Sequence, residues 1–408
     1  MSKKPQTVTT RPLNRYVIYS IVFWILMFHI EFLEKYFFAY FFPLSLSLLY
    51  VTITKKFDPI IIALGIAIFA INTVANPGVT GSFLSTLFPV AYLFLSIVGF
   101  YSIINFGRYH FLDFKRAIHL SIIIILTIGS LEHIGYLGDA IKRYQEWNFQ
   151  GYYTNIARDL DIYGHSRVVA FSREPSHFAF TISILSTSAL LLSSNVSSVA
   201  ITIVAVLLSI YICPSPIYIT YFFFLALFTR IHLLHSHTFL MTLMFASLIL
   251  YLFGPELLSV RMHSIISQQD ASSIIRIWAP LKLLWSWDPV PIFGFGLGQE
   301  IHYASKIRSI YSEIGVPWGA LELRYNDPLH NAFVETVLQL GYIGALIIVG
   351  LMSYWVKKLN IMISVFWIGF IVIFGTIGGI STFRGWGALA IILVSYEFAS
   401  LRRNKKVF

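Results

Sequence analysis

The chain has 408 residues, of which 57% are hydrophobic and only 12% charged, and its formal net charge is +10. Soluble domains carry about 25% charged residues, so this composition excludes an ordinary water-soluble protein and indicates a polytopic membrane protein. Cys213 is the single cysteine and has no partner for an internal disulfide. Without a His/Cys spacing pattern, neither thiolate metal binding nor redox chemistry is expected.

The beginning of the chain predicts an uncleaved membrane span. Residues 1–15 form a polar, basic leader that includes Lys3 and Arg15. The apolar run after this leader is as long as a spanning helix, whereas a signal peptide has a shorter apolar region and a cleavage site.

Apolar segments of about 17 to 20 residues, one or two of them shorter, recur along the chain and predict about twelve transmembrane helices in one integral domain, 1–408. The predicted fold class is therefore an all-α polytopic membrane protein. The segments lie near 16–34, 36–54, 59–75, 83–106, 117–135, 175–193, 197–213, 216–229, 238–253, 330–354, 361–380 and 386–400.

Basic residues in the short loops predict the orientation, because such residues favour the cytoplasmic side of a membrane. With the N-terminus inside, Lys55-Lys56, Arg108, Arg230 and Lys357-Lys358 all fall inside, as does the basic tail after residue 401. Both termini are thus predicted to be cytoplasmic.

The short outside loops hold only Lys35 and Arg384, and the eleven Lys and Arg residues outside the short loops and the termini lie in two long outside loops, 136–174 and 254–329. Long loops are exempt from the charge rule, so the topology does not explain their basicity, and we expect an anionic partner. Two alternatives remain open: contact with anionic lipid headgroups, or balance by the loops' own acids. Those acids include Asp139, Glu146, Asp159, Asp161, Asp270, Asp288, Glu300, Glu313, Glu322 and Asp327.

The larger loop contains a predicted interfacial helix that Ser272 caps and that Pro289 and Pro291 end. Arg276 falls nearly opposite its apolar face, where it would meet substrate or water. That face would comprise Ile274, Trp278, Leu281 and Trp285.

A glycine cluster, Gly294-Phe295-Gly296-Leu297-Gly298, follows this helix. A phosphate-binding turn would need a preceding strand, a following helix and an acidic residue beyond, and none is evident. We therefore predict a turn that allows two backbones to approach closely.

Asp327-Pro328 predicts the start of the next membrane helix, with Asp as N-cap and Pro at the first helical position. His330 would then lie in the first turn, where the helix end favours a bound anion and disfavours imidazolium. His330 is our candidate for a neutral base. The alternative is an interfacial histidine that only contacts headgroups.

The smaller loop ends in Ser172-Arg-Glu-Pro-Ser-His177, and Pro175 again predicts a helix start. Arg173 and His177 are four residues apart, which would place them on one helical face, with Glu174 at the membrane edge. The alternative is that the arginine and the histidine are interfacial anchors.

Together these motifs resemble the superfamily of O-antigen polymerases (Wzy-type) and O-antigen ligases. The resemblance depends on Arg276-Ile-Trp, the glycine cluster, His330-Asn331 and Gly341-Tyr-Ile-Gly344, in that order. Arg173-Glu-Pro-Ser is similar to an element of many polymerases. At the motif level it covers about 172–180 and 272–345. One departure is Pro214-Ser215-Pro216, where many relatives have a Ser-Arg pair.

The resemblance implies a GT-C-like membrane glycosyltransferase that polymerises polyprenyl-diphosphate-linked repeat units at the periplasmic face of a bacterial inner membrane. It implies no cofactor or metal and no nucleic acid as a partner. Membrane lipids and a chain-length regulator (polysaccharide co-polymerase) are the other partners that it implies. Two alternatives stay open: a ligase that transfers polysaccharide onto lipid A core, and a flippase for lipid-linked oligosaccharide.

The expected site combines the motif residues with the chemistry of the donor. Arg173, Arg276 and Arg324 would hold the diphosphate by charge-assisted contacts. His330 would be the catalytic base, and Glu174 is the second candidate for that role. The remaining substrate-binding candidates are His177 and Asn331.

Overall fold

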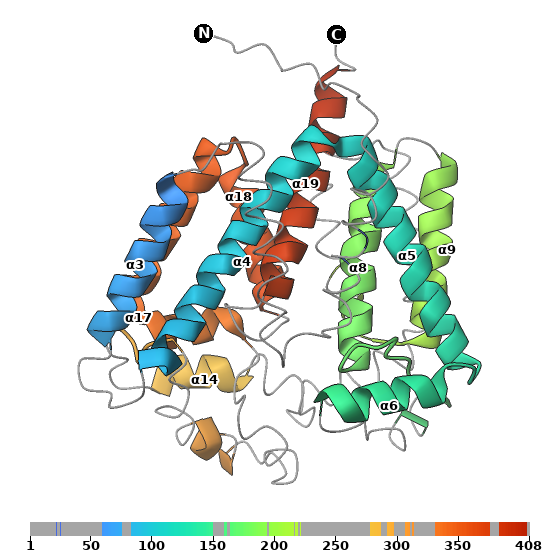
Figure 1. Cartoon of the computed structure of the whole chain (residues 1–408), viewed down its shortest axis with the longest axis horizontal. Coiled ribbons are helices and arrows are strands. Elements are labelled where there is room, and N and C mark those ends of the chain that lie inside the picture. Colours follow the sequence, from blue (N-terminus) through green and yellow to red (C-terminus); the bar gives the residue numbers. More distant parts are fainter. Residues whose placement is uncertain are drawn as a thin grey trace. The chain divides into compact units, whose positions relative to one another are not determined.

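The computed structural model describes eight stretches of the chain and a few shorter pieces, and their regular secondary structure is entirely helical (Figure 1). The stretches are 59–75, 83–149, 164–193, 196–215, 278–286, 292–297, 331–375 and 383–405. The shorter pieces are Val22, Ile25, 159–160, 217–218, Tyr221, 307–310 and 312–313.

Three described helices are long and apolar enough to cross a membrane: Pro89–Tyr109 within α4 (Phe83–Tyr109), α8 (Pro175–Leu192) and α17 (Ala332–Lys358). A fourth candidate is the bent pair α5 (Phe111–His133) and α6 (Gly138–Phe149), which turns by 106°. This part of the chain is therefore all-α and suited to a membrane.

Eight of the predicted apolar segments coincide with described helices. Besides α4, α5, α8 and α17, these are α3 (Pro59–Ala75), α9 (Val196–Ile212), α18 (Ile363–Phe374) and α19 (Phe383–Lys405). The predicted segments 16–34, 36–54, 216–229 and 238–253 fall almost entirely outside the described residues.

The chain divides into two compact units. Unit 1 comprises Met1–Ser45, Phe100–Ile249 and Ala390–Phe408. Unit 2 comprises Leu46–Gly99 and Leu250–Leu389.

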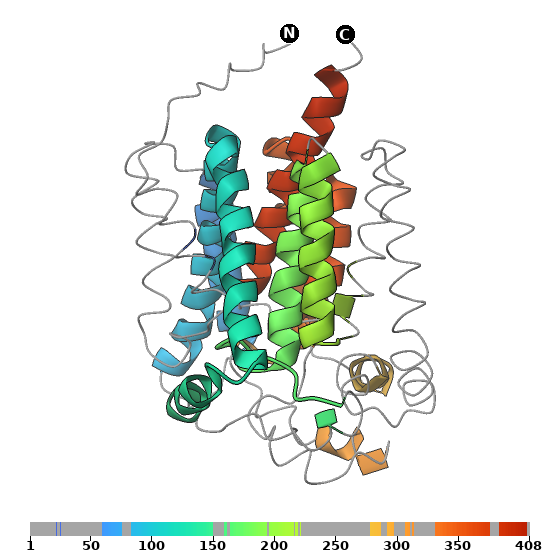
Figure 2. The same cartoon turned by 90° about the vertical axis from the view of Figure 1, so that its right-hand side faces the viewer.

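In unit 1, α5, α8 and α9 run side by side, and α6 crosses the foot of α5, where Figure 2 shows it end-on. Small residues allow this close packing. A Cβ on Gly129 of α5 would lie 3.1 Å from the Phe178 ring of α8 and 3.2 Å from Ile212 of α9. Helix α8 is buried along almost its whole length.

Unit 1 also joins the end of α4 to α19. The Arg108 guanidinium and the Glu397 carboxylate form an ion pair at 2.7 Å. The rings of Phe111 and Phe398 stack with centroids 3.8 Å apart.

In unit 2, α17 packs on α3 and α18. A Cβ on Gly344 of α17 would lie 2.8 Å from the Ile71 side chain of α3, so the two helices approach closely at this glycine. An aromatic cluster of Phe370, Phe374 and Trp386 fills the space beside α18.

Candidate functional site

Helix α8 begins at Pro175, as the sequence predicts, with Glu174 as its N-cap in an extended conformation (φ −141°, ψ 154°). Arg173 precedes the helix and is exposed, whereas Glu174 and His177 are half-buried. Because Arg173 is not helical, the four-residue helical spacing to His177 does not place the two side chains on one face.

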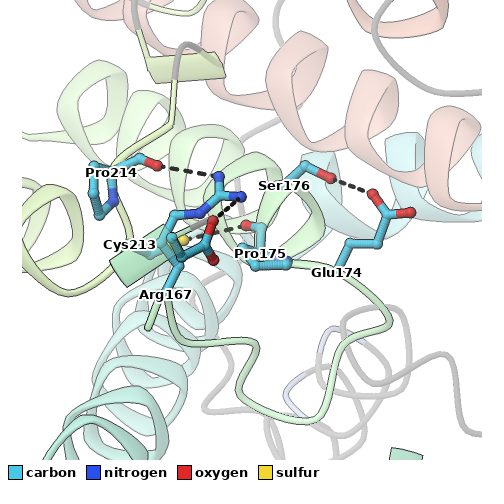
Figure 3. Close-up of polar contacts among 7 residues, drawn as sticks. Arg167, Glu174, Pro175, Ser176, Cys213 and Pro214 are labelled. Carbon is cyan, nitrogen blue, oxygen red and sulfur yellow. Dashed lines mark hydrogen bonds and ion pairs between the residues drawn. The ribbon is translucent and has the colours of Figure 1, made fainter. Parts of the chain in front are cut away.

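The Glu174 residue is fixed by its own neighbours. Its carbonyl oxygen accepts hydrogen bonds from the His177 N–H (2.9 Å) and the Ser172 hydroxyl (2.9 Å). Its carboxylate accepts from the Ser176 hydroxyl at 3.1 Å, and in Figure 3 the Glu174 side chain points toward Ser176. The carboxylate at the start of α8 is therefore held rather than free to rotate.

The segment before α8, which we call the 164–174 loop, is attached to the end of α5 through Glu132. The Val169 N–H lies 3.1 Å from each Glu132 carboxyl oxygen, and the Ala170 N–H donates to one of them at 2.6 Å. Successive backbone N–H groups that converge on one anion form a strong, charge-assisted contact.

This contact accompanies an uncommon backbone conformation. Ala170 and Phe171 have φ values of 46° and 68°, in the left-handed region that residues with a Cβ rarely adopt. Each such residue costs about 1–2 kcal/mol, and two follow one another here. Contacts around the loop must offset that cost.

Two further contacts hold the same loop. The Gln145 amide of α6 donates to the Ser172 carbonyl at 2.8 Å, and the rings of Tyr144 and Phe171 meet edge to face at 5.2 Å. Burial raises the pKa of the Tyr144 phenol, so this side chain stays neutral. Helix α6 thus supports the 164–174 loop through its buried side.

A buried ion pair joins Arg167 of the 164–174 loop to Asp159, which precedes the loop. The Arg167 guanidinium contacts the Asp159 carboxylate at 3.0 Å, with 6% and 0% of the two side chains exposed. Arg167 also donates to the Pro214 carbonyl at 3.4 Å, and the Cys213 thiol donates to the Pro175 carbonyl at 3.3 Å (Figure 3). At Arg167 the structure therefore supports the second alternative above, balance by an acid of the same predicted outside loop, 136–174.

In unit 2, α14 (Ala279–Ser286) corresponds to the predicted interfacial helix. Ala279 is buried, whereas the expected apolar face is turned outward, with 37%, 39% and 84% of Trp278, Leu281 and Trp285 exposed. The exposed face suits a membrane interface. Ser272, Arg276, Pro289 and Pro291 lie outside the described residues. Lys282 pairs with Glu313 at 2.7 Å, again within the loop.

The glycine cluster packs its backbone against a break in α17, which confirms the prediction of close backbone approach. Gly341 interrupts α17 with φ 69° and ψ 176°. A Cβ on Gly294 would collide with the Gln339 carbonyl and the Gly341 N–H, and a Cβ on Gly341 would collide with the Ile292 carbonyl. Only glycine fits at both positions.

Hydrogen bonds from the 292–297 turn replace those that the break removes. The Leu338 carbonyl accepts from the Phe295 N–H, and the Gln339 carbonyl from the Gly296 N–H, both at 2.8 Å. The Ile343 N–H donates to the Ile292 carbonyl at 3.3 Å. A broken apolar helix is stable when its backbone groups are satisfied in this way.

The buried side chain of Asn72 on α3 completes this arrangement. Its amide oxygen accepts a hydrogen bond from the Leu297 N–H at 2.6 Å. Asn72 is 3% exposed, so the 292–297 turn is fixed to α3 as well as to α17.

Helix α17 begins later than predicted. Its N-cap is Asn331, whose side-chain oxygen accepts from the Val334 N–H at 3.1 Å, so the assignment of Asp327 as N-cap and Pro328 as first helical residue of this helix is wrong. Asparagine is among the strongest N-caps, and here its side chain satisfies a free helix donor. His330 therefore immediately precedes the N-cap. His330 and Arg324 lie outside the described residues.

The half of α17 before the break carries buried polar side chains. Gln339 donates to the Glu335 carboxylate at 2.9 Å, and these residues are 3% and 9% exposed, respectively. A carboxylate inside an apolar helix is uncommon and is typical of functional positions.

The expected site residues thus belong to two units. Arg173, Glu174 and His177 gather at the start of α8 in unit 1, whereas Asn331 caps α17 in unit 2. Comparison with family models, curated proteins and solved structures finds no match for this chain.

Glu132, Asn72 and Glu335 were not among the residues predicted from the sequence. Each is a polar residue within an otherwise apolar segment, and this position is the signal that could have identified it. The partners of Glu132 and Asn72 are backbone N–H groups far along the chain, and no pattern in the sequence indicates them.

Proposed function

We propose that the chain is an O-antigen polymerase, a glycosyltransferase that joins polyprenyl-diphosphate-linked repeat units at the periplasmic face of a bacterial inner membrane. The observation that carries this proposal is the fixed loop that presents exposed Arg173 and half-buried Glu174 at the start of the apolar helix α8. A lipid diphosphate has its anionic group at this level of a membrane, where an arginine can bind it with two parallel hydrogen bonds.

In the proposed reaction, an acceptor sugar hydroxyl attacks the anomeric carbon of the donor. The new glycosidic C–O bond forms as the bond to the lipid diphosphate breaks, and the diphosphate leaves with the electron pair. His330 takes the hydroxyl proton, and Arg173, Arg276 and Arg324 stabilise the leaving group. A single displacement of this kind inverts the anomeric configuration.

The glycine motifs give the proposal secondary support. Gly294 and Gly341, which belong to separate motifs of the resemblance, contact one another directly. Their contact accounts for glycine at both positions.

Twelve spans with both termini in the cytoplasm belong to the same proposal. Reporter fusions after residues 150 and 300 should give periplasmic signals, and fusions after residues 56 and 404 should give cytoplasmic signals. A cytoplasmic signal at 300 would remove the basis of the proposed site.

The catalytic role of His330 is tested by His330→Ala in the full chain. General-base assistance contributes about a hundred- to ten-thousandfold in rate, so long chains should disappear from a silver-stained lipopolysaccharide gel at unchanged protein level. If chain lengths stay at wild type, His330 is not the base, and Glu174→Gln becomes the next variant to measure.

A second candidate function, lipid-linked oligosaccharide flippase, is favoured by one observation. Discontinuous helices with buried polar groups are typical of transporters, and α17 is broken at Gly341 beside Glu335 and Gln339. A deletion strain separates the alternatives: loss of long chains with single-unit caps retained indicates a polymerase, and loss of all caps indicates a flippase or a ligase.

A further inference from the structure

We propose that Glu132 is a positioning residue for the diphosphate site: its carboxylate holds the 164–174 loop in the conformation that presents Arg173 to the lipid-linked donor. The ligand in this inference rests on the proposed function. The contact between Glu132 and the loop does not, because the hydrogen bonds to Val169 and Ala170 are properties of unit 1 alone.

The loop needs a partner to keep its shape. Ala170 and Phe171 have positive φ values although neither is glycine, so their conformation is unfavourable without external contacts. The backbone N–H groups at this turn form an anion-binding concavity of the kind that elsewhere receives phosphate. Here Glu132 supplies the anion from within the protein.

The position of Glu132 is itself costly. It lies in the last turn of the apolar helix α5, where the helix dipole is unfavourable for a negative charge. A carboxylate at such a place requires donors, and the donors that the structure provides are the Val169 and Ala170 N–H groups. The carboxylate and the loop therefore stabilise each other.

The consequence concerns Arg173. On its N-terminal side, Val169 and Ala170 are bound to Glu132, and Ser172 is bound to the Gln145 amide and the Val169 carbonyl. On its C-terminal side, Glu174 is the fixed N-cap of α8. The Arg173 side chain is exposed between these two fixed points. An arginine on an immobilised backbone loses less freedom when it binds an anion.

Because the Glu132 carboxylate already occupies the N–H groups of the turn, an external anion meets the Arg173 guanidinium rather than the backbone. This arrangement suits the diphosphate of a membrane-embedded lipid. The role of Glu132 is thus indirect, and its loss should act through Arg173.

The first measurement is hydrogen exchange of the full chain in nanodiscs, comparing wild type with Glu132→Gln. Glutamine keeps the size of the side chain but turns an NH₂ group toward the loop donors. We expect at least about a tenfold rise in exchange at Val169 and Ala170, since a rise of this size corresponds to loss of one strong hydrogen bond. Glu146→Gln, an exposed position on α6, is the matched control and should leave exchange unchanged.

The second measurement is binding of undecaprenyl diphosphate to the same nanodiscs. We expect Arg173→Ala to weaken binding about ten- to a hundredfold, as for loss of charge-assisted hydrogen bonds. Glu132→Gln should also weaken binding, and the double variant should bind no more weakly than Arg173→Ala alone. Adding Ala170→Gly to Glu132→Gln should restore part of the affinity, because glycine accepts the positive φ without the carboxylate.

Three results would overturn the inference. If amide exchange at Val169 and Ala170 is unchanged in Glu132→Gln, the contact with Glu132 does not stabilise the loop. Additive effects of Glu132→Gln and Arg173→Ala on binding would mean that Glu132 does not act through Arg173. Absence of binding to wild type, with exchange raised in Glu132→Gln, would reject the diphosphate of the proposed function and thereby the positioning role.

Discussion

The 164–174 loop of unit 1 lies against the C-terminal end of α5, and the 292–297 turn of unit 2 lies against the break in α17. In the loop, a side-chain carboxylate from Glu132 accepts the backbone N–H groups, and residues with a Cβ adopt positive φ values. In the turn, backbone pairs with backbone, and glycine occupies the contact on both sides. Buried backbone N–H groups thus donate to a side-chain carboxylate in the loop and to backbone carbonyls in the turn. In the turn, glycine allows the two backbones to come close enough.

This difference predicts different sensitivities. The turn leaves no room for any side chain at Gly294 or Gly341, so steric changes should be most damaging there. The loop is held by two acidic side chains, Glu132 and Asp159, so substitutions that keep their shape and replace the carboxyl group should be most damaging in unit 1. Four substitutions separate these two kinds of dependence.

Gly341→Ala should have the largest effect. The added Cβ would collide with the Ile292 carbonyl and the Gly294 N–H, and alanine disfavours φ 69°. Strain and overpacking together should destabilise the protein by about 2–6 kcal/mol, measured by thermal unfolding in detergent. Gly350→Ala, in the same helix with open space around it, is the control and should be neutral or slightly stabilising. Equal effects of the two substitutions would contradict the close backbone contact.

Asp159→Asn should rank next. It keeps the shape of the side chain but leaves the buried Arg167 guanidinium without its counter-charge. Breaking a buried pair costs about 3–5 kcal/mol at most sites, and the other contacts of Arg167 reduce that cost here. Glu313→Gln breaks the exposed pair with Lys282 and should cost no more than about 1 kcal/mol in the same unfolding measurement. If Asp159→Asn lowers the free energy of unfolding no more than Glu313→Gln does, charge does not hold the loop.

Asn72→Leu should have a smaller effect than either. It removes the acceptor of the buried Leu297 N–H, and an unsatisfied buried donor costs about 1–3 kcal/mol. Thr73→Ala, at the next and exposed position of α3, should stay within about 0.5 kcal/mol of wild type. If both variants unfold at the wild-type temperature, Asn72 does not fix the turn.

Ala170→Gly should have the smallest effect and should stabilise the protein. Glycine removes the steric cost of a Cβ at φ 46°. This gain exceeds the cost of the larger unfolded-chain entropy by up to about 1 kcal/mol. Ala140→Gly, at an exposed position in the middle of α6, should destabilise by about 0.5–1 kcal/mol. Destabilisation by Ala170→Gly would mean that the methyl group contributes packing that outweighs the strain.

The sequence predicted the parts of the fold that follow from local composition. The apolar segments 59–75 and 175–193 agree with α3 and α8 to within a residue, because membrane length and Pro175 determine where those helices begin and end. The close backbone packing at the glycine cluster was also predictable. The strand, helix and acidic residue that a phosphate-binding turn needs are not evident around the cluster, so the glycines indicate close contact between two backbones. The start of α17 was not, because Asn331 and Asp327 are both good N-caps and only tertiary structure selects between them.

The candidate site was predictable only in part. The Arg173-Glu174-Pro175 motif indicated a helix start with a cation and a carboxylate, and the structure has both there. Glu132 could not be assigned to this loop from sequence, because its partners are backbone atoms of Val169 and Ala170, which carry no side-chain signal. The left-handed conformation of Ala170 and Phe171 was equally hidden, since neither is the residue that such a turn usually requires.

The most direct test of the proposed polymerase uses the purified full chain in detergent, with lipid-linked repeat units extracted from a strain that lacks it. A detergent solution has no two compartments separated by a membrane. Transport therefore gives no signal in this assay, and only formation of a glycosidic bond does. We expect the chain alone to convert single units into products of many units and to release polyprenyl diphosphate. Single units that remain unchanged, while the same protein in liposomes moves them across the bilayer, would contradict the polymerase and establish the flippase.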